Sequence, residues 1–117
     1  MELEWIKSTS GTWLPLNTVV LDSVTAAGVY IIWYQGKQGQ AGKVVYVGQG
    51  DIASRLRSHR QNSRIQAYAA HGLLVSWASV DARYRDGVER YLADTWKPLV
   101  GEAHPVTSPI AVKAPWQ

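Results

Sequence analysis

Two tyrosines in neighbouring β-type runs are the first residues whose type and spacing suggest chemistry. Tyr30 lies in the run 28–35 (GVYIIWYQ), and Tyr46 lies in the run 43–48 (KVVYVG). Both runs are rich in residues that favour strands, and the segment GKQGQAG between them predicts a β-hairpin with a long loop. Tyrosines on adjacent antiparallel strands can project from one face and converge. Taken singly, a strand tyrosine is usually a core residue, so the pattern leaves packing and catalysis both open.

A basic side chain and a titratable one lie on the helix predicted over 51–61 (DIASRLRSHRQ), which Asp51 is expected to cap. Helical spacing places Arg55 and His59 beside the apolar stripe, whereas Arg57 points away from it. Arg55 therefore has the position of a guanidinium held against the sheet. An arginine whose stem covers the core while its head stays in water explains the same spacing.

A carboxylate lies on the last predicted helix, which Asp81 caps and which runs to about Trp96 before Pro98. Glu89 lies at the border of its apolar stripe, and such a carboxylate can ligate a hard divalent cation. An ion pair with Arg85, four residues earlier, is the alternative, and helical spacing alone favours it.

Length and composition limit the classes of protein that can carry these groups. The chain has 117 residues, 46% of them hydrophobic and 18% charged, which predicts one small domain with its own core. It has no cysteine, which excludes a disulfide partner and a cysteine nucleophile and fits a cytoplasmic location. No run approaches the roughly 20 apolar residues of a membrane span, so neither anchor nor signal peptide is expected. The three histidines lack metal-binding spacing, so we expect no histidine zinc site.

The order of the predicted elements indicates an α+β fold with a small, mainly antiparallel sheet flanked by helices. A third strand is predicted over 73–80, after a short helical segment that ends at Gly72. Residues 1–26 are expected to pack on the core as an extension, 27–102 to form the main domain and 103–117 to be an irregular tail.

Five short motifs along the chain resemble those of the GIY-YIG nuclease family in their order and approximate spacing. The resemblance covers about two-thirds of the chain, from residue 27 to 102. Its motifs are Gly28-Val29-Tyr30, Tyr46-Val47-Gly48, Arg55 and His59 in the pattern IxxRLxxH, and Glu89 in ExxL followed by Pro98.

The resemblance implies a three-stranded antiparallel sheet and a metal-dependent DNA endonuclease that hydrolyses phosphodiester bonds with one Mg²⁺ or Mn²⁺. Glu89 would be the metal ligand and Arg55 would hold the scissile phosphate. The residues themselves leave open whether a tyrosine or His59 activates water, because a phenol ionises little at neutral pH and an imidazole readily. The family favours Tyr30 as the base, with Tyr46 beside it and His59 orienting a tyrosine or the phosphate.

Two departures from the family support the alternative of a nucleic-acid-binding module with the nuclease fold and little or no activity. The two tyrosines are 16 residues apart, which is longer than usual, although a hairpin tip tolerates insertion. The asparagine that often follows the helix-ending proline is missing, and Glu102 is a candidate for its role. A third possibility is a protein-interaction domain that uses the tryptophan-rich N-terminal segment.

Contacts to DNA are expected from the basic residues, in a monomer or weak dimer whose binding weakens with salt. The candidates are Arg57, Arg60 and Arg64, with Lys37 and Lys43 beside the hairpin loop and the backbone near Gly48 at the start of the helix. Trp33, Tyr34 and Trp77 could stack on unpaired bases. A solvated helix face and core aromatics are the alternative interpretations, and the net charge of only +3 gives them weight.

Overall fold

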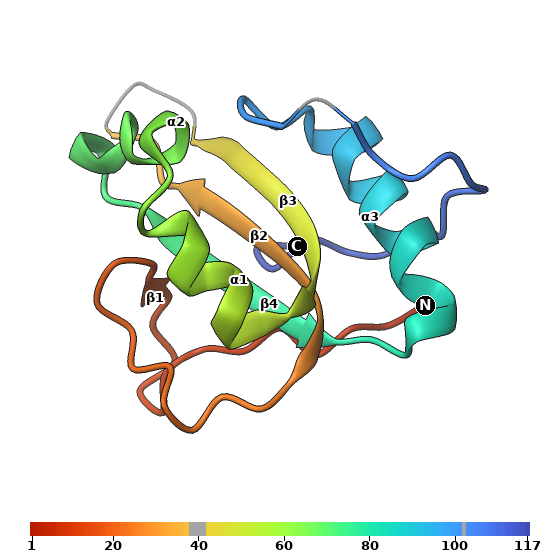
Figure 1. The fold of residues 1–117 in the computed structure, drawn as a ribbon, viewed down its shortest axis with the longest axis horizontal. Coiled ribbons are helices and arrows are strands. Elements are labelled where there is room, and N and C mark those ends of the chain that lie inside the picture. The colour runs from red at the N-terminus through yellow and green to blue at the C-terminus, as the bar shows by residue number, and fades with distance from the viewer. Residues whose placement is uncertain (38–41, 102) are drawn as a thin grey trace.

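A four-stranded antiparallel sheet lies at the centre of the protein, in the order β1-β4-β2-β3 (Figure 1). The structure is a computed structural model that describes residues 1–37, 42–101 and 103–117. Its strands are β1 (Leu14–Pro15), β2 (Ala27–Tyr34), β3 (Lys43–Asp51) and β4 (Leu74–Ser79). The helices are α1 (Ile52–His59), α2 (Ser63–Gln66), the short 3₁₀ turn η1 (Ala69–His71) and α3 (Ala82–Trp96). The predicted α+β class is confirmed.

The prediction of three strands is wrong, because residues 1–26 contribute a fourth. In β1, Leu14 pairs with Val75 and Pro15 with Leu74 of β4. A proline is tolerated there because β1 is an edge strand. The composition of residues 1–26 indicates short strands or turns packed on the core, but a two-residue strand has no alternating pattern that would mark its pairing with β4.

The two faces of the sheet carry separate hydrophobic cores, each covered by one helix. Alternate residues of β2 supply both: Tyr30 and Ile32 pack with Leu56 of α1, whereas Ile31 packs with Val88 of α3. The helices begin where the sequence predicts, because the Asp51 carboxylate accepts a hydrogen bond from the Ser54 amide and the Asp81 carboxylate accepts one from Arg83.

A β-bulge in β3 places Val45 on the same face of the sheet as Tyr46, the face that α1 covers. Ile32 pairs with Tyr46 and Trp33 with Val44, which leaves Val45 as an extra residue on β3. As a result the neighbours Val45 and Tyr46 both pack on the α1 side, whereas strict alternation would separate them.

The segment after α3 runs along the outer edge of β3. The amides of Leu99 and Val100 donate to the carbonyls of Val44 and Val45, at 3.2 and 2.8 Å. Farther on, the Ile110 amide donates to the Gly87 carbonyl of α3 at 2.9 Å. The C-terminal segment is therefore packed on the core, although it has no regular secondary structure. None of the helices within the described ranges has the length and apolar character needed to span a bilayer.

Candidate functional site

Three aromatic rings from two strands and a helix form the centre of the candidate site. The Tyr30 and Tyr46 rings are stacked, with centroids 6.1 Å apart and planes 15° apart. The His59 ring lies 4.4 Å from Tyr46 and 5.4 Å from Tyr30, and its Nε2 atom is 2.5 Å from the Tyr30 hydroxyl. Tyr30 is fully buried and His59 is 5% exposed, whereas Tyr46 is partly exposed. Only Tyr46 of the three thus has substantial access to solvent.

Gly48 makes this stacking possible, because it pairs with Tyr30 across the strands. A Cβ atom at Gly48 would overlap the Tyr30 phenol and crowd the Tyr46 ring. The glycine therefore has a packing role in the site. Its predicted backbone contact with DNA stays a prediction.

Arg55 supplies the positive charge of the site. Its side chain is exposed on α1, and its charge interacts with the nearby Tyr30 and Tyr46 phenols. The interaction with Tyr30 raises the pKa of Arg55, so the group stays a cation at any physiological pH.

Burial sets the protonation of the Tyr30–His59 pair. Burial, together with the nearby Tyr46 and Glu89, raises the pKa of Tyr30 well above its ordinary value, against the opposing effect of Arg55. Burial and the charge of Arg55 lower the pKa of His59 to about 4. At neutral pH the imidazole is therefore uncharged and the phenol protonated, and the tautomer of the imidazole sets the direction of the hydrogen bond between the Tyr30 hydroxyl and His59 Nε2.

Glu89 approaches the same site from α3 and is only 7% exposed. Its Oε2 atom is 3.0 Å from Nδ1 of His104. The alternative pairing with Arg85 is absent, since Arg85 Nε donates to the Val80 carbonyl at 2.7 Å. A bond of 2.7 Å from Gln49 Nε2 to Asp86 Oδ1 ties β3 to α3 close to this point.

The five residues that the sequence singled out thus come together near one edge of the sheet. His104 is a further member that sequence reasoning missed. It lies in an irregular segment with no periodic or spacing signal, and only the course of residues 99–101 along β3 brings that segment to the site. Gly101 lies against the Tyr46 ring. Glu102, the candidate for the missing asparagine's role, falls outside the described residues.

The arginines predicted to bind DNA have different surroundings. Arg60 donates to the backbone carbonyls of Leu16 and Val19, at 2.8 and 2.5 Å. Arg57 forms an exposed ion pair of 3.2 Å with Asp22. Arg64 is exposed on α2.

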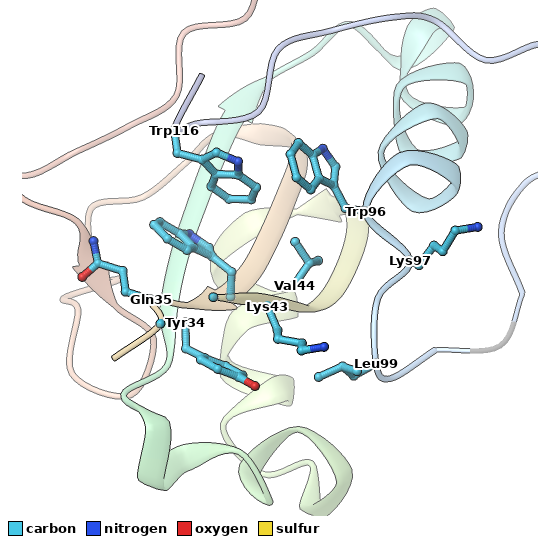
Figure 2. A pocket seen from close by; sticks show the side chains of 11 residues that line it. Tyr34, Gln35, Lys43, Val44, Trp96, Lys97, Leu99 and Trp116 are labelled. Carbon is cyan, nitrogen blue, oxygen red and sulfur yellow. The ribbon is translucent and has the colours of Figure 1, made fainter. Parts of the chain in front are cut away.

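A cavity of about 510 Å³ lies beside the hairpin end of β2 and β3, about three residues along β3 from Tyr46. Trp96 and Trp116 lie on one side of it and Tyr34, Lys43 and Leu99 on the other (Figure 2). Trp33 also lines it, although only 6% exposed, and donates to the Ser76 hydroxyl. Trp77 is 5% exposed within the α1-side core. Base stacking by Trp33 and Tyr34 stays a prediction, and Trp77 has no open ring face.

The donor set at Glu89 fits a weakly held hard cation. Mg²⁺ is commonly bound through one or two carboxylates and keeps several water ligands. One largely buried glutamate with an oxygen near solvent can therefore serve as the ligand from the protein. No group of three or more histidine, cysteine or acidic residues that could hold a metal occurs in the described part of the chain.

Comparison of the chain with protein-family models, with curated proteins and with solved structures found no match.

Proposed function

We propose that this protein is a metal-dependent DNA endonuclease that hydrolyses phosphodiester bonds with a GIY-YIG type of site. The observation that carries the proposal is the pair of stacked phenols between an exposed guanidinium and a buried carboxylate: Arg55 and Glu89, on different helices, both act electrostatically on Tyr30. A guanidinium and a carboxylate on either side of two phenols suit the cleavage of a phosphodiester, which is an anion.

Arg55 would bind the scissile phosphate. Its guanidinium is exposed, is permanently charged and presents several donors in one plane, which match phosphate oxygens. Its charge lies beside the two phenols, where it would stabilise the negative charge that grows on the phosphate oxygens.

Glu89 would hold a divalent cation, Mg²⁺ or Mn²⁺. Such a cation supplies Lewis-acid stabilisation of the charge that develops on the phosphate. The carboxylate is already shielded from bulk water, which strengthens its attraction for a cation.

The two tyrosines would have different roles. Tyr46 is the phenol with access to solvent, so its oxygen can orient or deprotonate the attacking water with Arg55 beside it. Tyr30 is fully buried and hydrogen-bonded to His59, and its raised pKa keeps it protonated, so it is a poor base in this state. The burial and bonding of Tyr30 therefore favour Tyr46 over Tyr30 as the base, with His59 orienting Tyr30.

A supercoiled plasmid incubated with the protein in Mg²⁺ or Mn²⁺ tests the proposal. We expect nicking that chelator abolishes and that Glu89→Gln and Arg55→Ala each reduce at least 100-fold. Asp94→Asn is the matched control, because Asp94 lies on the same helix, is exposed and pairs only with Arg90 among the described residues. Full nicking by the Glu89→Gln protein would exclude this site. Binding of DNA without any cleavage by the unsubstituted protein would favour the binding-module alternative.

A further inference from the structure

We propose that His104 is a positioning residue for the cation site, fixing the Glu89 carboxylate so that its second oxygen is presented to the metal. The inference rests on the proposed function and extends it to a residue that no sequence motif marks. It follows from one contact between two largely buried side chains, with exposures of 16% for His104 and 10% for Glu89.

The chemistry of the pair fixes the direction of the hydrogen bond. An ionised carboxylate has no proton to give, so His104 Nδ1 must donate to Glu89 Oε2 across the 3.0 Å that separates them. Among the described residues, the other Glu89 oxygen, Oε1, has no hydrogen-bond partner. It is not fully enclosed by the protein, so it reaches solvent. One oxygen is thus held and the other is available to a cation.

The backbone near His104 is anchored to the site itself. Leu99 and Val100 are bonded to β3, and Gly101, with a φ of +105°, turns the chain beside the Tyr46 ring. Pro105 then restricts the backbone after His104. This anchoring keeps the imidazole near the end of a glutamate side chain that would otherwise sample several rotamers.

The consequence is a preorganised ligand. Groups that hold a metal ligand in place typically change metal affinity by about 10–100-fold when they are removed. A glutamate that must first lose its rotamer freedom binds a cation more weakly, because ordering the side chain costs free energy. His104 would thus strengthen cation binding without touching the nucleic acid.

Binding of Mn²⁺ to the protein alone, followed by electron paramagnetic resonance, tests the inference on a matched pair of variants. His104→Leu removes the donor. His104→Asn, whose side chain branches at the same atom as that of leucine, keeps an N–H near the position of Nδ1. We expect the dissociation constant for Mn²⁺ to rise about 10–100-fold in His104→Leu and to recover substantially in His104→Asn. His71→Ala is the control, because that histidine stacks on Tyr34 away from the site.

The outcomes separate this inference from the proposed function. If the unsubstituted protein and Glu89→Gln bind Mn²⁺ equally, the metal site is wrong and the inference fails with it. If Glu89→Gln loses binding but His104→Leu does not, the function stands and the role of His104 is overturned. Magnetic resonance of the unsubstituted protein guards against unfolded variants: Mg²⁺ should shift the ring signals of His104 and not those of His71, and unmoved His104 signals would contradict the inference.

Discussion

At the scale of single residues, burial gives the two stacked tyrosines unlike chemistry. Tyr30 has no exposed surface and its hydroxyl is engaged by His59, whereas Tyr46, one ring away, retains access to solvent. The same burial keeps His59 uncharged at neutral pH. The pair Tyr30–His59 therefore acts as a neutral, hydrogen-bonded support for the charged groups around it.

This neutral support predicts a pH dependence of stability. Burial and Arg55 lower the pKa of His59 to about 4 in the folded protein, whereas an unfolded histidine titrates near 6.5. Between these values the unfolded chain binds more protons, so the free energy of unfolding falls as the pH is lowered through this window, by up to about 3 kcal/mol. Urea unfolding at pH values from 4.5 to 7.5 measures this change in the free energy of unfolding.

His59→Gln is the control for that dependence, because its amide oxygen can accept from Tyr30 but does not titrate. We expect the difference in stability between the two proteins to change with pH below about 6.5 and to be constant above it. Parallel curves over the whole range would show that His59 is not buried in its neutral form.

Gly48→Ala tests the close approach of the phenols to β3. The new methyl group would overlap the Tyr30 ring, so we expect a loss of about 1–3 kcal/mol in the free energy of unfolding. Because the Tyr30 hydroxyl is the nearest atom, Tyr30→Phe should relieve part of this cost in a double-mutant cycle measured by urea unfolding. Strictly additive costs would argue against the overlap.

At the scale of elements, the sequence predicts those helices and strands whose bounds are set by neighbouring residues. The capping aspartates, the proline after Trp96 and the β-branched runs act within a few residues, and they located α1, α3 and the hairpin strands to within a few positions. β1 and the bulge at Val45 depend on pairing with distant strands and carry no local pattern. They could not be predicted from the sequence.

The candidate site also has contacts that the sequence predicts and contacts that it does not. Tyr30 and Tyr46 were expected to converge because adjacent antiparallel strands bring their faces together, and their rings do stack. The partner of Glu89 was not predictable, since helical spacing favoured Arg85 and only the irregular chain after α3 brings His104 to the carboxylate.

The contacts of Arg60 predict that it fastens the N-terminal segment to α1. Its guanidinium donates to two backbone carbonyls, of Leu16 and Val19, and charged hydrogen bonds of this kind are strong. Arg60→Ala should therefore lower the free energy of unfolding by about 2 kcal/mol. Arg57→Ala breaks only an exposed ion pair with Asp22 and should cost less than about 1 kcal/mol. Equal losses in urea unfolding would contradict this assignment.

At the scale of the whole molecule, the candidate site lies where segments distant in sequence meet. α1 covers one face of the sheet and α3 the other, yet both helices contact the edge strand β3, and the charges of Arg55 and Glu89 both affect the pKa of Tyr30. A single site of the proposed kind would cut one strand at a time. We therefore expect open circular plasmid to accumulate before linear plasmid.

The surroundings of the arginines also predict how DNA binding depends on salt. The Glu89→Gln protein provides a background for measuring affinity without cleavage. Each arginine that contacts a phosphate contributes about one unit to the slope of log Kd against log salt concentration. Arg57 has an exposed guanidinium, so Arg57→Ala should lower the slope by about one unit.

Arg60→Ala should leave the slope unchanged, because the Arg60 guanidinium already donates to backbone carbonyls. Fluorescence anisotropy of a labelled duplex between 50 and 300 mM salt, over which the Debye length falls from roughly 14 to 6 Å, measures both slopes. A drop in slope for Arg60→Ala equal to that for Arg57→Ala would mean that Arg60 leaves the N-terminal segment to bind DNA.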